Sequence, residues 1–209
     1  MADELILYTN PMSRGRVARW MLEEVGQPYK TEIVDYATIK SPAYLAVNPM
    51  GKVPALRHGD VVVTETAAIC AYLADAFPQA HLAPPPGHRL RGPYYRWLFF
   101  TAGPVEAAAS NKAIGVVVPP DRERMMGYGN IGLVLKTLED AVAKSDYLVG
   151  ASFTAADLYV GAHLGFGMMF GGIEKRPAFE RFWQRVGSRP AFLRAKELDE
   201  AAAPQQKAG

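Results

Sequence analysis

The sequence predicts an α/β domain followed by an all-helical domain. Strand and helix patterns alternate through the first eighty residues in the order β-α-β-α-β-β-α. A proline-rich stretch, Pro84-Pro85-Pro86, then interrupts the chain, and apolar residues at helical spacing fill most of the remaining sequence. The expected organisation is an α/β domain, a linker, a helical domain and a disordered tail, over residues 1–78, 79–87, 88–200 and 201–209.

The α/β domain begins with the apolar strand Leu5–Tyr8. A helix follows from about Ser13 to Val25 and stops at Gly26, a residue that commonly ends helices. The sequence after Gly26 predicts a second strand that runs to Val34. Because the connection is long enough for a right-handed crossover, these two strands should be parallel.

The rest of this domain is predicted from turn and helix-start signals. Ser41-Pro42 opens a short helix, since proline favours the first helical position. Pro54–Leu56 and Val61–Val63 read as an antiparallel hairpin around a Gly59-Asp60 turn. The apolar segment Ala67–Phe77 is the last helix. We therefore expect one small mixed sheet with helices on both faces.

The second domain shows no strand pattern. Long helices are expected over residues 89–109 and 121–144, separated by Pro119-Pro120. A third helix begins at Thr154, where Thr154-Ala155-Ala156-Asp157 forms a capping box with Asp in place of Glu or Gln. Shorter helical pieces are expected over residues 179–187 and 191–198.

Composition excludes several classes of function. A net charge of +2 with dispersed basic residues does not favour nucleic-acid binding. The single cysteine, Cys70, excludes an intramolecular disulfide framework, and its apolar helical position favours a buried, inert thiol over a reactive one. No histidine has a metal-ligand neighbour at useful spacing, so no metal is expected. Without a leader or a long apolar run, the sequence predicts a cytoplasmic protein with no membrane role.

Residues 48–66 carry the groups that could hold an extended peptide ligand. Pro54 at the head of a strand, after Lys52-Val53, favours a tight turn with a cis peptide bond that directs the Val53 backbone toward a ligand. Glu65-Thr66 opens a helix, which places a carboxylate, a hydroxyl and unpaired N–H groups together. The alternative interpretation is a plain hairpin followed by a capped helix, with Thr64 or Thr66 as the cap.

Together, these motifs resemble a cytosolic, bacterial-type glutathione transferase. The Val-Pro loop, the Glu-Thr helix start, the proline linker and the Thr154–Asp157 box occur in the order and spacing of that family. The resemblance implies a thioredoxin-like first domain that binds glutathione as co-substrate. It also implies that Lys52 contacts the glycyl end, Val53 with Pro54 the cysteinyl part, and Glu65 with Thr66 the γ-glutamyl head.

The resemblance leaves two candidates for the group that stabilises the glutathione thiolate. One alignment places Ser13 on the serine of the serine-type classes, at the start of the first helix. The other aligns Arg14-Gly15-Arg16 with the tyrosine-type classes, which places Asn10 at their tyrosine and makes Arg14 a supporting residue. Ser13 is preferred, although a helix N-cap requires the same residue type there. Arg16 and Arg19 are expected as solvated or domain-interface charges.

The implied activity is attack of the thiolate on a hydrophobic electrophile, or reduction of a peroxide. The absence of cysteine from the first helix disfavours the cysteine-type classes. A glutathione-dependent isomerase or dehalogenase, and a non-catalytic glutathione-binding protein, remain as alternatives. The family also implies a homodimer. Candidates for the electrophile pocket, each of which is otherwise plain core, are Met12, Trp97, Phe100, Met168 and Met169.

Overall fold

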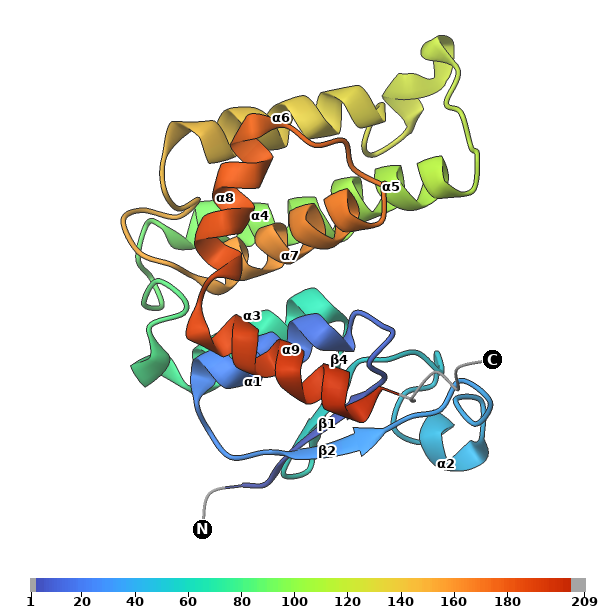
Figure 1. Cartoon of the computed structure of the whole chain (residues 1–209), viewed down its shortest axis with the longest axis vertical. Helices are drawn as coiled ribbons and strands as arrows, with labels where there is room; N and C mark the ends of the chain where they lie inside the picture. Colours follow the sequence, from blue (N-terminus) through green and yellow to red (C-terminus); the bar gives the residue numbers. More distant parts are fainter. Residues whose placement is uncertain (1–2, 204–209) are drawn as a thin grey trace. The chain divides into compact units, whose positions relative to one another are not determined.

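The computed structural model describes residues 3–203. Within this range the chain divides into two compact units. The first joins the residues up to Ala80 with the segment from Arg189 onward, and the second runs from His81 to Ser188. A mixed sheet lies in the first unit, and the second unit is helical (Figure 1). The predicted fold class, a thioredoxin-like α/β domain followed by an all-helical domain, is confirmed.

The first unit contains a four-stranded sheet in the order β2-β1-β3-β4. As predicted, β1 and β2 are parallel, and β3 and β4 are antiparallel. Strand β3 is also antiparallel to β1. Its elements are β1 (Leu5–Thr9), α1 (Gly15–Val25), β2 (Lys30–Ile33), α2 (Pro42–Leu45), β3 (Ala55–His58), β4 (Val61–Thr64), α3 (Thr66–Ala76), the short 3₁₀ turn η1 (Pro78–Ala80) and α9 (Pro190–Ala202).

The two central strands carry the core of the first unit. Leu7 in β1 and Leu56 in β3 are fully buried and lie opposite each other. Helices α1 and α3 pack on the sheet and against each other, and Trp20 of α1 and Leu73 of α3 are buried. Helix α1 ends where Gly26 takes a left-handed conformation, with φ 71°, and donates its N–H to the Leu22 carbonyl at 2.9 Å.

The second unit is built from helices. Its elements are α4 (Arg91–Phe100), the π-helical turn η2 (Thr101–Val105), α5 (Glu106–Ala113), the 3₁₀ turn η3 (Pro120–Met125), α6 (Ile131–Lys144), α7 (Ala155–Met169) and α8 (Pro177–Gly187). Within residues 3–203, no helix combines the length and the apolar character needed to cross a membrane.

Two predicted helices differ from the observed ones. The segment expected as one helix over residues 89–109 continues to Ala113, with a π-helical turn that accommodates Pro104, which has no N–H to donate. The helix expected over 121–144 begins only at Ile131. Gly129 takes a left-handed conformation, with φ 64°, and the side chain of Asn130 caps the new start by accepting the Leu133 N–H at 2.9 Å.

The last helix was assigned to the wrong domain. Helix α9, expected within residues 88–200, packs against α1 in the first unit. There the rings of Phe192 and Trp20 meet edge-on, with their centroids 4.9 Å apart. Arg189 pairs with Glu24 of α1 at 2.6 Å. Part of the expected disordered tail is helical, because α9 extends to Ala202, and residues 204–209 lie outside the described part.

Helix α7 is the central helix of the second unit and is buried over most of its length. Its start has the predicted capping box: Asp157 accepts hydrogen bonds from the Thr154 N–H at 2.9 Å and from the Thr154 hydroxyl at 2.8 Å. The other carboxylate oxygen accepts the Leu148 N–H at 2.6 Å. Burial raises the pKa of Asp157 to about 6, and these hydrogen bonds act in the opposite direction. A buried carboxylate thus joins the loop at Leu148 to the start of α7.

Candidate functional site

The register of the sheet brings the predicted binding segments to one edge. Tyr8 pairs with Ala55, and Ala55 pairs with Thr64. The residues just beyond these positions are the loop after β1, the Val53-Pro54 turn before β3 and Glu65 after β4. Because neighbouring strands lie about 4.8 Å apart, these three segments form a row at the same end of the sheet. The loop at residues 10–13 therefore lies next to the turn, and the turn next to Glu65.

Two side chains hold the turn before β3 in place by hydrogen bonds. The Val53–Pro54 peptide bond is cis, as the sequence predicted. The Lys52 carbonyl accepts hydrogen bonds from the Tyr44 hydroxyl at 2.7 Å and from the Asn48 side chain at 2.8 Å. Val53 packs against a small apolar cluster that includes Tyr44. Among the residues described, the Val53 backbone forms no hydrogen bond, which leaves its N–H and carbonyl for an extended ligand.

Glu65 stands at the start of α3 in an unusual backbone conformation. Its φ is 65° and its ψ is 118°, in a region that favours glycine. Its side chain is exposed, and within residues 3–203 no side chain caps the first turn of α3, so neither Thr64 nor Thr66 fills the expected capping role. The first N–H groups of α3 and a carboxylate therefore meet at the sheet edge, where they can bind the carboxylate and the ammonium of one amino acid.

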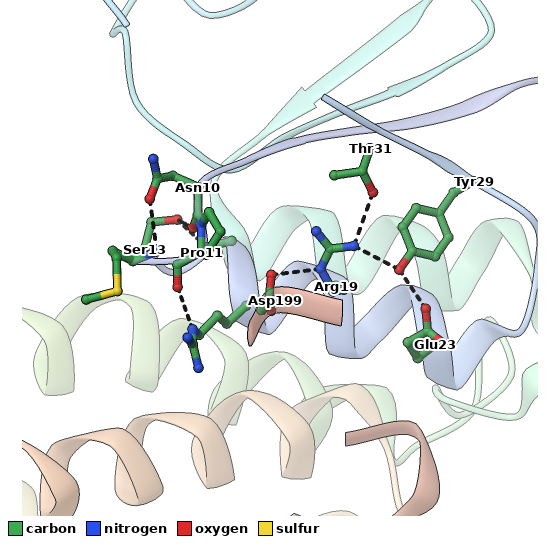
Figure 2. Close-up of polar contacts among 11 residues, drawn as sticks. Asn10, Pro11, Ser13, Arg19, Glu23, Tyr29, Thr31 and Asp199 are labelled. Carbon is green, nitrogen blue, oxygen red and sulfur yellow. Dashed lines mark hydrogen bonds and ion pairs between the residues drawn. The ribbon is translucent and has the colours of Figure 1, made fainter. Parts of the chain in front are cut away.

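The loop after β1 is closed by its own polar side chains (Figure 2). The Asn10 side chain donates to the Val34 carbonyl at 3.0 Å and accepts the Met12 N–H at 2.9 Å. The Ser13 hydroxyl donates to the Asn10 carbonyl at 2.7 Å and accepts the Gly15 N–H at 2.9 Å. Both candidates for thiolate stabilisation thus lie on this loop, and each contributes to its shape.

Gly15 allows the loop to approach β1 closely. A Cβ atom at Gly15 would lie 1.8 Å from the Thr9 hydroxyl oxygen and 2.9 Å from the Thr9 Cβ. Thr9 is fully buried on β1, and rotation of its side chain would move the hydroxyl but not the Cβ atom. The sequence offered Gly15 as an alignment marker, whereas the structure gives it a steric role.

Gly15→Ala is expected to lower the free energy of unfolding by about 1–3 kcal/mol, since the added methyl group would lie too close to the Cβ atom of the buried Thr9. Gly92→Ala is the matched control, because Gly92 also lies in the first turn of a helix, but no atom of another described element lies within 4 Å of its Cβ position. That control should be neutral or slightly stabilising. Urea unfolding of both variants checks the difference, and equal midpoints would contradict the steric role.

Two arginines of α1 are not solvated charges, the first of the two alternatives that the sequence offered. Arg16 is half-buried and donates its Nε–H to the Pro11 carbonyl at 2.5 Å. Arg19 is buried and forms an ion pair with Asp199 of α9 at 2.8 Å (Figure 2). Neither residue is a solvated charge. Their spacing of three residues on one helix face was visible in the sequence, but nothing there identified Asp199 as the partner. Arg14, in contrast, is exposed.

The electrophile-pocket candidates fall in different environments. Met12, on the loop after β1, is 70% exposed and suits contact with a ligand. Trp97 and Met168 are buried in the second unit, in keeping with a core role. Phe100 is half-buried, and its ring meets the Trp97 ring edge-on, with the ring centroids 5.6 Å apart. Met169 is 65% exposed. Met12 and Met169 are thus the candidates most accessible to a ligand.

Cys70 lies in α3 with no exposed surface, as expected for an inert thiol. Burial raises the pKa of Cys70 to about 12, so almost no thiolate forms near neutral pH. The thiol used in any reaction at this site must therefore come from a ligand.

The chain matches two family models, described as the N-terminal domain of glutathione S-transferase over residues 7–81 and its C-terminal domain over residues 107–190. Among curated proteins, it is 32% identical to glutathione S-transferase F13 of Arabidopsis thaliana over 181 residues, which cover 74% of this chain and 76% of that protein.

Solved structures agree with these matches. A glutathione transferase from Methylococcus capsulatus superposes with a TM-score of 0.79 at 28% identity, over 94% of this chain and 99% of that one. The glutathione transferase URE2P6 of Phanerochaete chrysosporium, solved in complex with oxidized glutathione, superposes with a TM-score of 0.79 at 28% identity. The match covers 96% of this chain and 98% of that one. Sequence, fold and sheet-edge geometry agree, and the chain belongs to the glutathione S-transferase family as a glutathione transferase enzyme.

Proposed function

We propose that this transferase binds glutathione along the row formed by the loop after β1, the Val53-Pro54 turn and Glu65. The observation that carries the proposal is the sheet register, which aligns Tyr8, Ala55 and Thr64. An extended tripeptide laid along this edge pairs its cysteinyl backbone with Val53 and extends its γ-glutamyl head to Glu65 and Thr66. Its glycyl end then lies toward Lys52, which is exposed.

The loop after β1 supplies the hydroxyl that stabilises the thiolate. The glutathione thiol loses its proton to solvent, and the Ser13 O–H donates a hydrogen bond to the resulting sulfur anion. The sulfur then forms a bond to an electrophilic carbon, and the leaving group departs with its electron pair. A hydrogen bond to an anion favours the ionised form and lowers the pKa of the thiol.

Two hydrogen bonds at the Asn10 carbonyl favour Ser13 over Asn10 as this donor. The carbonyl accepts both the Ser13 hydroxyl at 2.7 Å and the Ser13 N–H at 3.0 Å. The hydroxyl can therefore turn to a ligand without leaving the carbonyl unpaired. The Asn10 side chain, by comparison, links Val34 to Met12 and maintains the shape of the loop.

Ser13→Ala is expected to raise the pKa of the bound glutathione thiol and to lower kcat/KM about tenfold, with little change in glutathione affinity, because it removes one hydrogen bond to a charged sulfur. The measurement is an ultraviolet titration of thiolate absorbance in the binary complex, with the pH dependence of kcat/KM beside it. Ser145→Ala is the matched control, since Ser145 is an exposed serine in the second unit. Unchanged turnover in Ser13→Ala would reject Ser13.

The hydrogen bonds of the Ser13 side chain favour a second candidate function. The Ser13 hydroxyl is already used within the loop, which is the arrangement expected of a glutathione-binding protein without thiolate activation. The titration of the unmodified protein separates the two. A thiol pKa well below the free value of about 8.5 supports the transferase mechanism, and saturable binding with an unshifted pKa supports the binding protein.

The proposal extends to the second substrate and the assembly. The exposed thioethers of Met12 and Met169 suit a hydrophobic electrophile.

A homodimer is proposed from the family alone, and light scattering coupled to size-exclusion chromatography tests it. A clean monomer would remove that part of the proposal.

A further inference from the structure

Two side chains hold the peptide group between Lys52 and Val53 by its oxygen atom. The Lys52 carbonyl accepts hydrogen bonds from the Tyr44 hydroxyl at 2.7 Å and from the Asn48 side chain at 2.8 Å. This peptide bond is trans, because the one cis bond of the described residues follows Val53. In a trans peptide the C=O and the N–H lie in one plane and point in opposite directions. The Val53 N–H, which has no partner among the described residues, therefore points away from the two donors.

The first donor, Tyr44 of α2, is fixed by apolar packing. It is 7% exposed and belongs to a buried cluster with Val34 and Ile39, and its ring centroid lies 6.1 Å from that of Tyr8 on β1. Burial raises the pKa of Tyr44 to about 12, and the nearby Tyr8 acts in the same direction. The Tyr44 hydroxyl therefore keeps its proton, and remains a donor, at every pH at which a bound thiol titrates.

The second donor, Asn48, is fixed at both ends of its side-chain amide. It is 3% exposed, and its Oδ1 atom accepts the Met50 N–H at 3.0 Å while its NH₂ group donates to the Lys52 carbonyl. Its main-chain N–H donates to the Tyr44 carbonyl at 2.9 Å. An amide whose oxygen and nitrogen are both engaged cannot turn over without losing both hydrogen bonds. Helix α2 and the loop after it thus present two fixed donors to one oxygen.

Two donors restrict a peptide plane more than one donor does. A carbonyl oxygen has two lone pairs, and a single hydrogen bond leaves the plane free to turn about that bond. Donors that come from separate positions remove this rotation. A binding group that is already oriented has less entropy to lose when a ligand arrives, so its hydrogen bond contributes more to affinity.

We propose that Tyr44 and Asn48 are positioning residues for glutathione: through the Lys52 carbonyl they direct the Val53 N–H at the carbonyl oxygen of the cysteinyl residue. The inference rests on the proposed binding of glutathione along the edge of the sheet. Neither side chain needs to contact the ligand. Because the cysteinyl residue carries the thiol, the same hydrogen bond sets where the sulfur lies relative to the loop after β1.

The test measures the dissociation constant for glutathione by calorimetry in full-length Tyr44→Phe, Asn48→Asp and the double variant. Phe keeps the ring in the cluster and Asp keeps an acceptor for the Met50 N–H, so each substitution removes one donor. Each is expected to raise the dissociation constant about three- to fivefold, and the double variant by more than the product, because its carbonyl has no donor left. S-methylglutathione should show the same ratios, since the contact is to the peptide backbone.

Two controls remove comparable hydrogen bonds away from the turn before β3. The Tyr29 hydroxyl donates to Glu23 at 2.6 Å, and the Asn111 side chain donates to the Tyr128 hydroxyl at 2.8 Å. Tyr29→Phe and Asn111→Ala are expected to lower the thermal midpoint and to leave the affinity for glutathione unchanged. If Asn48→Asp shows no cooperative thermal transition, Asn48→Ser takes its place, because it removes the same donor without adding a charge.

The amide proton of Val53, followed by heteronuclear NMR, separates positioning from stability. It is expected to move downfield when glutathione saturates the unmodified protein, and to move less in the Tyr44 and Asn48 variants at the same saturation. A role in stability alone would leave the saturated shift unchanged. If glutathione binds without moving this proton in the unmodified protein, the proposed placement of the ligand fails and this inference with it. If the proton moves, and affinity and shift are the same in Tyr44→Phe or in the folded Asn48 variant, only this inference fails.

Discussion

Asp157→Ala is expected to lower the free energy of unfolding by about 3–4 kcal/mol, the largest loss of stability predicted for a single substitution in this chain. The carboxylate accepts three hydrogen bonds, from the Leu148 N–H, the Thr154 N–H and the Thr154 hydroxyl. Asp157 has no exposed surface, so water cannot replace the lost acceptor. For a chain of this length, the thermal midpoint should fall by about 10 °C.

Two further variants test the cause of this loss. Asp157→Asn keeps the size of the side chain but offers one acceptor oxygen to three donors, so its loss should be intermediate. Asp140→Ala is the control, because Asp140 is also an aspartate of the second unit but pairs with Lys136 on the surface, with 62% of its side chain exposed. Its effect should stay within about 0.5 kcal/mol. Equal urea midpoints for Asp157→Ala and Asp140→Ala would contradict the role of the capping box.

The sequence predicted this box because its signal is local. Thr154 and Asp157 stand three positions apart before an apolar run, and no distant residue is needed to interpret them. The same holds for the hairpin around Gly59-Asp60 and for the cis bond before Pro54. The pairing of β3 with β4 in the candidate site could be predicted for the same reason, because a short turn joins them. The pairing of β1 with β3 was not predicted, because these strands are distant in the sequence.

The features that the sequence did not predict depend on distant partners or on backbone strain. The pairing of Arg19 with Asp199 joins residues from opposite ends of the chain, and an acidic residue near the C-terminus resembles any surface charge in the sequence. The domain assignment of α9 failed for this reason, because a helical pattern does not indicate which unit the helix packs on. The positive φ of Glu65 was not predicted either, because glycine is the residue type that indicates a positive φ in a sequence.

Glu65 should nevertheless have the largest effect on binding. Under the proposed function, its carboxylate pairs with the γ-glutamyl ammonium of glutathione. Glu65→Gln keeps the size of the side chain and removes its charge, so the dissociation constant for glutathione is expected to rise about 100-fold or more. Isothermal titration calorimetry measures this directly. Asp60→Asn is the control, because Asp60 is an exposed acidic residue at the opposite end of the same hairpin.

Glu65→Gly separates binding from stability. A residue other than glycine with φ of 65° holds backbone strain of about 1–2 kcal/mol, which glycine relieves. Glycine also makes the unfolded chain more flexible, which offsets up to about 1 kcal/mol of that gain. The thermal midpoint should therefore stay the same or rise, while glutathione affinity falls at least as far as in Glu65→Gln.

This combination tests whether the strained conformation is kept for binding. If Glu65 were only a structural start for α3, both substitutions would leave the affinity for glutathione unaltered. If the carboxylate is the ligand for the ammonium, affinity is lost in both variants and stability in neither. A Glu65→Gln variant that binds glutathione as tightly as Asp60→Asn would rule out the carboxylate as that ligand, and the first turn of α3 would then have to hold the γ-glutamyl head through its N–H groups alone.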